Sequence, residues 1–435
     1  MTAKTEQREI KIQVPVLARV EGEGALDLAI HDGRIADLRL RIYEPPRLFE
    51  QFLVGRDHGE IPDLVARICG ICPVAYQMSG VHAVERLFRC EPNPWVYRLR
   101  RLLYCGEWIQ SHALHIHLLA APDFLGFENA LAMAARHGAA LRRGLHLQGL
   151  GNRIIGLIGA RSVHPVGVRV GGFWKAPDPS QAAALRWEIE RALPAAEALL
   201  AWTAALPLPD DEQPFVCVAL HDPHAYPMIA DRIRSDGGLD ISVDEFESHF
   251  EERQVPHSTA LQGLHRGLPY LVGPLARINL NADLLHPRVL KALARTGIRF
   301  PSRNMYHSVV ARAAELLQAL LEAAEILADY APSDPAYTEV SPRAGTGIGA
   351  SEAPRGLLWH RYDLDHQGRI GHARIVPPTS QNQARIEEDL RHALTRAGLD
   401  QNPDTLRQIG EKVIRNYDPC ISCATHFLRL NLSRG

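Results

Sequence analysis

The sequence predicts an α+β chain that is mainly helical and folds as a single domain over residues 1–435. Residues 9–43 alternate apolar and polar side chains, which indicates strands, whereas most later segments carry apolar residues at helical spacing. Thirty prolines and 33 glycines are spread along the chain. Because no Gly/Ser-rich linker and no internal repeat divides it, we expect one compact unit.

The N-terminal segment predicts an antiparallel β meander. The stretches IKIQVPVLARV, GALDLAIH and RIADLRLRIY each alternate in polarity, and Asp32-Gly33 supplies a hairpin turn between the last two. A second strand pair is expected far downstream, where GLLWHRYDLDHQGRIGHARIVPP folds back around the turn at Asp365–Gly368. We expect hairpins of this kind at the periphery.

Residues 44–435 predict a helical core that holds the functional site. Pro73 suits the first turn of a helix with the sequence PVAYQMSGVHAVERLF. The segment ARAAELLQALLEAAEILADYA is the clearest amphipathic helix, with a broad apolar stripe for burial. The other expected helices cover about 94–119, 129–149, 180–204, 285–296, 303–331, 380–397 and 403–416.

Charge and hydropathy exclude several classes of protein. The net charge of −2 does not indicate binding to nucleic acid, and the sequence has no polybasic segment that would bind anionic lipid. No stretch reaches the roughly 18 apolar residues that a membrane span needs. The N-terminus lacks the apolar core of a signal peptide, so a cytoplasmic location is expected. A chain exported while attached to a signal-bearing partner would look the same.

The seven cysteines do not predict a disulfide framework, because their number is odd and the chain is large. Four of them form two C-x-x-C pairs near opposite ends of the sequence. The other three are isolated and are expected to be small buried core residues. These are Cys90, Cys105 and Cys217.

The two cysteine pairs predict a shared metal site. Cys69 and Cys72 stand in ARICGICPVAY, and Cys420 and Cys423 stand in YDPCISCATHF. Two sulfurs three residues apart, on a turn that leads into a helix, can chelate one ion, and the helix N-terminus favours ionised thiols. Together the pairs offer four soft ligands for zinc, copper(I), nickel or iron.

The separation of the pairs bears on which metal they bind. Structural zinc sites usually bracket about 12–20 residues between pairs, because the metal replaces a missing core. Here the pairs stand near opposite ends of the chain, which is large enough to form a hydrophobic core without a structural metal. The spacing therefore favours a catalytic or redox metal, while a structural zinc and unrelated thiols remain alternatives.

Several motifs resemble those of nickel–iron hydrogenase large subunits, and the resemblance covers essentially the whole chain. The two strongest are RICGICP at 67–73 and DPCISCATH at 418–426; the others are ARVEGEG, RLFE, SHALH, HPVGVRVGG, EAPRGLL and VPPTSQN. The first cysteine motif and its surroundings are most similar to the cytosolic, pyridine-nucleotide-linked subgroup called sulfhydrogenases. The resemblance implies the large-subunit fold, with a long-helix bundle core, an N-terminal meander and peripheral hairpins.

The resemblance also implies an activity, the reversible heterolytic cleavage of H2 to protons and electrons at a nickel–iron centre. Carried over to this sequence, Cys69 and Cys420 bind nickel terminally, while Cys72 and Cys423 bridge nickel to iron. In the family, iron is completed by one carbon monoxide and two cyanide ligands, which maturation enzymes supply.

Four further residues acquire catalytic roles from the resemblance. Cys420 receives the proton, and Glu21 in RVEGEG relays it outward. Arg355 lies over the open metal face and contacts cyanide, and Asp418 holds this arginine. Without the resemblance, Glu21 would be interpreted as a solvated acid at a strand end and Arg355 as a surface charge.

Three residues are expected to surround the centre. Pro354 and Thr379 match residues that pack against the diatomic ligands or hydrogen-bond to them. Ser111 stands where membrane-bound relatives have aspartate, so the resemblance predicts less negative charge around Arg355.

A second metal site, usually magnesium, is implied near the C-terminus. Its residues are Glu50, the main-chain carbonyl of Ile375, and His426. A carboxylate and water suit magnesium, whereas imidazole is less usual for it. Only FLRLNLSRG follows His426, so either a C-terminal endopeptidase trims a short tail after nickel insertion or the protein matures without cutting.

Partner subunits are implied by electron counting, because the two electrons from H2 must leave the chain. The isolated cysteines lack the spacing of iron–sulfur ligands, and no G-x-G-x-x-G motif could bind a dinucleotide. We therefore expect an iron–sulfur small subunit. The subgroup adds flavin, NAD(P) and further iron–sulfur subunits, as in a heterotetramer. The rival hypotheses are a zinc-bound scaffold, an H2-sensing subunit, and a relative of the complex I subunit that lacks the paired thiols.

Overall fold

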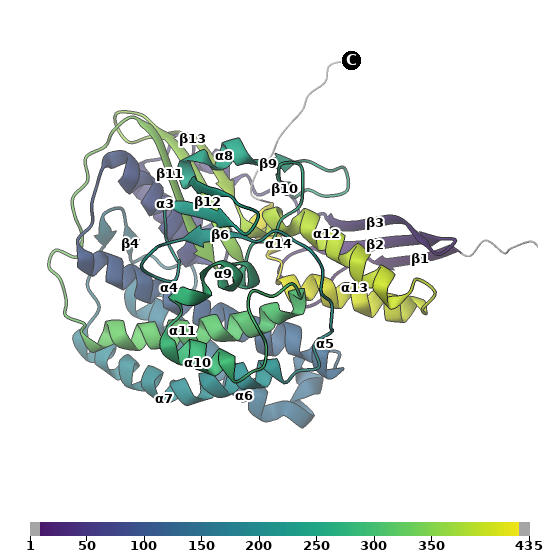
Figure 1. Cartoon of the computed structure of the whole chain (residues 1–435). Coiled ribbons are helices and arrows are strands. Elements are labelled where there is room, and N and C mark those ends of the chain that lie inside the picture. Colours follow the sequence, from purple (N-terminus) through teal and green to yellow (C-terminus); the bar gives the residue numbers. More distant parts are fainter. Residues whose placement is uncertain (1–8, 426–435) are drawn as a thin grey trace, which may run out of the picture.

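Alternating side chains build the N-terminal meander in the computed structural model, which describes residues 9–425. The strands β1 (Glu9–Val14), β2 (Gly24–His31) and β3 (Arg34–Ile42) pair antiparallel in that order. In β1 every second side chain is buried. The meander projects at one side of the molecule (Figure 1), where β3 contacts α12 (Pro378–Ala397) and β1 contacts α13 (Pro403–Tyr417). The first strands of the described chain therefore pack against its last long helices.

Four long helices pack together in the lower half of the view in Figure 1: α4 (Pro94–Leu114), α6 (Ala130–Gly159), α7 (Pro179–Ala204) and α11 (Ser308–Ala328). Helix α4 packs against α6 and α11, and α7 packs against α11 and α6. Nearly every residue of α11 is buried. Helix α11 is thus enclosed on all sides over residues 308–321, whereas the sequence predicted burial of a broad apolar stripe.

Two helices differ from the ranges expected from sequence. Helix α4 continues through a wider π-helical turn, His115–Ala120, into α5 (Ala121–Leu125). Helix α6 runs well beyond its predicted end near Gly149. Apolar residues continue at helical spacing after that position, and glycine weakens a helix without stopping it.

A three-stranded sheet is buried at the end around residues 350–360 and exposed at the opposite end, near residues 345–346 and 371–372. The predicted strand pair, β12 (Gly356–Leu364) and β13 (Ile370–Val376), is extended by β11 (Gly345–Ala353). Strand β11 was not predicted, because its three glycines interrupt the alternating pattern that indicates a strand. The sheet packs against α3 (Pro73–Phe88), and β11 and β12 are joined by a tight turn at Pro354-Arg355.

Short elements complete the described part of the chain, and most were not predicted. The small antiparallel sheets are β4 (Val168–Arg169) with β5 (Gly172–Phe173), β6 (Val218–His221) with β7 (Arg232–Ser235) and β8 (Asp240–Ser242), and β9 (Phe250–Arg253) with β10 (Gln262–His265). The short helices are α1 (Phe49–Leu53), α2 (Ile61–Val65), α8 (Phe246–His249), α9 (Pro274–Asn281), α10 (Pro287–Ala294) and α14 (Ile421–Ala424). Within residues 9–425, no helix combines the length and apolarity that crossing a membrane requires.

The turn between β11 and β12 depends on glycine. Gly356 has φ +134°, a conformation that other residues rarely adopt, and an added Cβ would lie 2.6 Å from Val272 Cγ2. Gly356→Ala should therefore lower the free energy of unfolding by at least about 2 kcal/mol, from backbone strain and overpacking. Denaturant titration measures this change.

A matched control for Gly356→Ala exists in α6. Gly156 is helical, and no atom lies within 4 Å of an added Cβ. Gly156→Ala should leave stability unchanged or raise it by up to about 1 kcal/mol. A Gly356→Ala protein as stable as the wild type would contradict the role given to this turn.

Candidate metal centre

The first cysteine pair lies on a loop that opens α3. Cys72 is the residue before the helix, and Pro73 occupies its first turn, where a missing N–H costs nothing. The main-chain N–H groups of Ile71 and Cys72 point at Cys69 Sγ, at 3.3 and 3.2 Å. Backbone donors and a helix N-terminus both favour a thiolate at this position.

The second pair follows a sharp reversal at the end of α13. Asp418 caps that helix in the left-handed conformation, with φ 58°. Aspartate tolerates this conformation, and a following proline disfavours further helix. The reversal delivers Cys420 to the start of α14, which carries Cys423.

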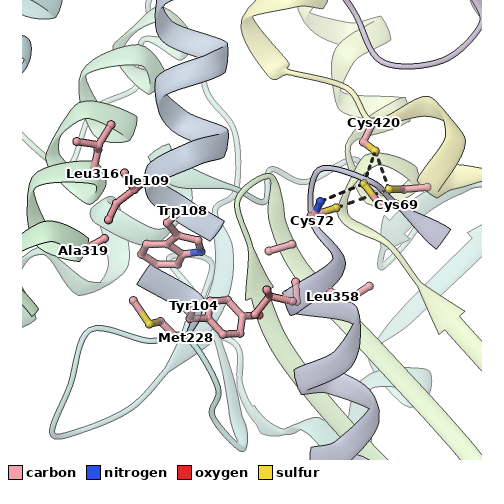
Figure 2. Close-up of a cluster of buried hydrophobic side chains, with 14 of the residues drawn as sticks. Cys69, Cys72, Tyr104, Trp108, Ile109, Met228, Leu316, Ala319, Leu358 and Cys420 are labelled. Atoms are coloured by element: carbon pink, nitrogen blue, oxygen red, sulfur yellow. Dashed lines mark hydrogen bonds between the residues drawn. The ribbon is translucent and has the colours of Figure 1, made fainter. Parts of the chain in front are cut away.

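The four sulfurs converge in the folded chain (Figure 2). Cys69 Sγ lies 3.5 Å from Cys420 Sγ, and Cys72 Sγ lies 3.8 Å from Cys423 Sγ. All four sulfurs lie within 4.8 Å of one another. Each cysteine is at most 3% exposed. Tyr104 and Trp108 belong to the same apolar core, at a distance from the sulfurs (Figure 2).

This donor set fits a soft metal. Burial raises the pKa of Cys420, and the neighbouring Cys423 raises it further. Several thiolates can therefore share this pocket only when a cation compensates their charge. Sulfur ligands select nickel, iron, zinc or copper(I) over hard ions such as magnesium.

Glu21 lies against the cysteine cluster. The Cys420 thiol donates a hydrogen bond to Glu21 Oε2 at 3.1 Å, and the Ser422 N–H donates to the same oxygen at 3.1 Å. The Glu21 carbonyl accepts from Ile421 N at 2.9 Å. The backbone approaches this closely because the next residue is Gly22, where a Cβ would lie 2.7 Å from Ile421 Cβ.

A second carboxylate, that of Glu44, lies beyond this contact on the side towards solvent and was not predicted from the sequence. Ser422 Oγ donates to Glu44 Oε2 at 2.9 Å. The Glu44 side chain is 14% exposed, so it lies nearer to solvent than the buried cysteines do. An isolated glutamate twenty-odd residues from Glu21 gives no motif that would have revealed it.

Arg355 occupies the tip of the β11–β12 hairpin and is 2% exposed. Its Nε donates to the Asp418 carbonyl at 2.8 Å, and its Nη2 donates to Asp418 Oδ1 at 3.0 Å. Its buried Nη1 has no hydrogen-bond partner among the described residues. Burial opposes the charge, yet the Asp418 carboxylate and the nearby cysteines hold the pKa of Arg355 above its usual range.

Asp418 is held from a second side by a residue that the sequence did not single out. Arg312, in α11, donates to Asp418 Oδ2 at 3.2 Å and to the Tyr417 carbonyl at 3.3 Å. Burial opposes ionisation of Asp418, but Arg355 and then other neighbouring cations keep its pKa below the ordinary value. Arg312 was missed because no sequence motif marks it.

The remaining predicted residues divide into two groups. Thr379 lies at the start of α12, where its Oγ1 accepts from Cys420 N at 3.0 Å, and Pro354 neighbours Arg355 on the hairpin. Ser111 is buried in α4, and its hydroxyl has no hydrogen-bond partner in residues 9–425. The structure thus joins Thr379 to the second cysteine pair by a hydrogen bond but does not join Ser111 to Arg355 in this way.

Two members of the expected magnesium site are in contact. The Ile375 N–H, in β13, donates to Glu50 Oε1, in α1, at 2.7 Å. This bond brings the Glu50 carboxylate to the Ile375 main chain. His426, the third expected member, lies outside the described residues.

Comparisons with known proteins agree with this geometry. The family model for nickel-dependent hydrogenases matches residues 47–146 and 254–426. The alpha chain of sulfhydrogenase 1 from Pyrococcus furiosus is 31% identical over 425 residues, which span 97% of this chain and 99% of the relative. The matching chain of an F420-non-reducing hydrogenase from Methanothermobacter thermautotrophicus is 29% identical, covering 96% of this chain and 95% of the relative.

Solved structures share the fold. An NAD+-reducing [NiFe]-hydrogenase in its H2-reduced state superposes with a TM-score of 0.85 and 26% identity, covering 96% of this chain and 99% of that one. The Ni-Fe-Se hydrogenase of Desulfovibrio vulgaris Hildenborough, 22% identical over 96% of this chain and all of that one (100%), has a TM-score of 0.80 and supports the fold alone.

The fold and the cysteine cluster define a metal-dependent oxidoreductase. The chain belongs to the nickel-dependent hydrogenase family. Within that family it is the catalytic large subunit of a nickel–iron hydrogenase.

Removing one thiol should abolish nickel binding. Cys69→Ala should lower the nickel content of purified protein by at least about 10-fold, because the site loses one of four ligands. Cys105→Ala removes an equally buried thiol outside the cluster and should leave nickel unchanged. Elemental analysis decides, and full nickel occupancy in Cys69→Ala would contradict the assignment.

Three buried histidines, at positions 112, 115 and 117, make stability depend on pH. Burial lowers the pKa of His112 to about 4, of His115 to about 3 and of His117 to about 4. In the unfolded chain they titrate near 6.5, so their contribution is complete above pH 6.5 and is lost as pH falls towards 4. Acidification from pH 6.5 to 5 should therefore weaken the fold.

His115→Asn tests this dependence. Between pH 6 and 4.5 the slope of the unfolding free energy against pH should fall by up to about 1.4 kcal/mol per unit, the value of one proton. His366→Asn changes an exposed histidine and should leave the slope intact. Equal slopes in the two variants would show that His115 is not held neutral.

Proposed function

We propose that this chain catalyses the reversible heterolytic cleavage of H2 at a nickel–iron centre held by Cys69, Cys72, Cys420 and Cys423. The observation that carries the proposal is the convergence of the four sulfurs in one buried pocket. A carboxylate and a guanidinium flank that pocket, as the reaction requires, because it separates a proton from an electron pair.

The metal pair is proposed to be bound as in relatives of the family. Cys69 and Cys420 are then terminal ligands of nickel, Cys72 and Cys423 bridge nickel to iron, and one carbon monoxide and two cyanides complete the iron. When bound, this group supplies the acceptor for the electron pair of H2. The unpartnered Nη1 of Arg355 supports anionic ligands nearby, because a buried N–H donor needs an acceptor.

The protein's own residues move the proton. The Cys420 thiolate accepts it, and Glu21 Oε2, 3.1 Å away, is within reach of the next transfer. The Ser422 N–H holds that oxygen in place. Arg355 contributes a fixed positive charge and Asp418 fixes its orientation, while Thr379 and Pro354 line the site.

A magnesium ion is proposed at Glu50, the Ile375 carbonyl and His426. The hydrogen bond from the Ile375 N–H to Glu50 supports this assignment, because it brings a carboxylate to the main chain of the residue whose carbonyl is the second expected ligand. The whole of residues 1–435 is proposed to act as one domain, since the relatives align along nearly its full length.

Electrons are proposed to pass first to a small iron–sulfur subunit, then through a flavin subunit to NAD or NADP. Support comes from relatives, which include the alpha chain of a sulfhydrogenase and an NAD+-reducing hydrogenase. Maturation factors that build the iron ligands are implied by the same centre.

Infrared spectroscopy of the purified, matured complex tests the proposal. One carbonyl band and two cyanide bands are expected, together with H2-dependent reduction of NAD+ or NADP+. Zinc as the sole metal, or matured protein without these bands, would contradict a nickel–iron centre. Bands without reduction of either nucleotide would remove only the proposed acceptor.

Glu21→Gln tests the proton relay. The amide keeps the size of the side chain but cannot shuttle a proton, so the rate of H2 oxidation should fall by at least about 100-fold. Nickel content should not change. Glu23→Gln alters an exposed glutamate two residues away and should retain wild-type turnover. Wild-type turnover in Glu21→Gln would exclude the relay.

A further inference from the structure

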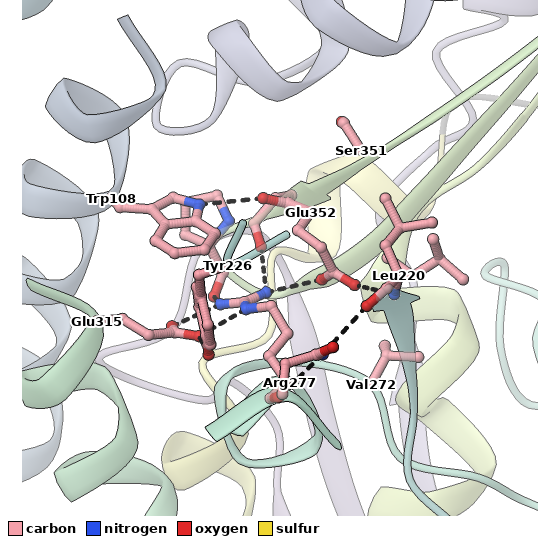
Figure 3. Close-up of polar contacts among 12 residues, drawn as sticks. Trp108, Leu220, Tyr226, Val272, Arg277, Glu315, Ser351 and Glu352 are labelled. Carbon is pink, nitrogen blue, oxygen red and sulfur yellow. Dashed lines mark hydrogen bonds and ion pairs between the residues drawn. The ribbon is translucent and has the colours of Figure 1, made fainter. Parts of the chain in front are cut away.

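A fully buried arginine, Arg277 of α9, lies between two carboxylates (Figure 3). Its Nε and Nη2 each donate to one oxygen of Glu315 at 2.7 Å, and its Nη1 donates to Glu352 Oε2 at 2.9 Å. The guanidinium also lies over the Trp108 ring, 4.6 Å from its centroid. Arg277, Glu315 and Glu352 are all 0% exposed.

The partners of Arg277 are themselves fixed by further bonds. Tyr226 donates its hydroxyl to Glu315 Oε1 at 2.7 Å, and the Leu220 N–H donates to Glu352 Oε1 at 2.7 Å. The Trp108 indole N–H donates to the Glu352 carbonyl at 3.0 Å. A buried network whose members are bonded on several sides holds one geometry rather than many.

The same guanidinium grips the hairpin turn that carries Arg355. Nη1 donates to the Ala353 carbonyl at 2.8 Å and Nη2 to the Pro354 carbonyl at 3.2 Å. With the Glu352 carboxylate, Arg277 thus binds three consecutive residues directly before Arg355. The carbonyl groups of Ala353 and Pro354 carry no net charge. The need to neutralise Glu315 and Glu352 therefore does not explain why Arg277 also binds these two carbonyls.

Two residues of helix α11 hold the groups that fix Arg355, one at its guanidinium and one at its backbone. At the tip, Asp418 binds Arg355 and is bound by Arg312 of α11. At the backbone, Arg277 holds the hairpin and is bound by Glu315, three residues further along α11. Arg355 is therefore fixed at both ends, and only its Nη1 is left without a partner among the described residues.

We propose that Arg277 is a positioning residue, which fixes the β11–β12 turn so that Nη1 of Arg355 keeps a set place beside the cysteine cluster. This inference rests on the proposed function, in which Nη1 meets the anionic iron ligands. Arginine is needed because its planar fork offers five donors in fixed directions. Lysine retains the charge but cannot bind two carboxylates and two carbonyls together.

Arg277→Lys in the matured complex is the test, compared at equal nickel content. The infrared cyanide bands should shift from their wild-type positions, because the donor beside the iron ligands moves. The kcat for H2 oxidation should fall by about 10- to 100-fold, the effect of a misplacement of about 1 Å, with KM for H2 little changed.

Arg100→Lys is the matched control. Arg100 is 2% exposed and forms a bidentate pair with Glu85, at 2.7 and 2.6 Å, but contacts neither the hairpin nor the cysteines. The Arg100→Lys variant therefore measures the general effect of replacing a buried, ion-paired arginine by lysine. The cyanide bands and the kcat of Arg100→Lys should match the wild type, and an equal shift in both variants would overturn the proposal.

Glu315→Gln provides a second route if Arg277→Lys does not fold. Glutamine preserves the side-chain volume but weakens the bonds to Arg277. We therefore expect a smaller shift of the cyanide bands in the same direction. Unchanged bands and kcat in a folded variant overturn the positioning role, as does failure of both variants to fold. Absence of the bands from the wild-type complex would instead refute the proposed function.

Discussion

Four cysteine sulfurs from opposite ends of the sequence share a pocket of apolar side chains, and this convergence is the constraint on which the fold depends. It requires the loop before α3 to meet the reversal after α13, and the N-terminal meander packs on α12 and α13 in the same part of the fold. Such close, buried thiols cannot all ionise without a cation. Metal binding should therefore stabilise the same contact between the two ends that the metal needs.

Charge around the pocket is arranged in successive contacts. Glu21 reaches Cys420 on one side, and on the other Arg355 is held by Asp418, which Arg312 holds in turn. Buried ions of this kind cost much desolvation and add little net stability. Their concentration around the four sulfurs supports the proposed catalytic role, since apolar residues would pack there at lower cost.

The sequence predicted more of the site than of its support. The two C-x-x-C pairs, with Pro73 opening a helix after the first of them, are local signals whose meaning does not depend on distant residues. Arg312 and Glu315 lack such a signal. In a helix they resemble solvent-exposed charges, and only tertiary packing shows that α11 is enclosed. Strand β11 was missed for a similar reason, because its glycines fit a close backbone approach rather than a strand pattern.

X-ray diffraction at the nickel and iron absorption edges, from crystals of the matured protein, tests the central claim most directly. The account predicts one nickel and one iron peak among the sulfurs of Cys69, Cys72, Cys420 and Cys423. A single zinc peak at this position, or nickel bound elsewhere in the chain, would contradict it.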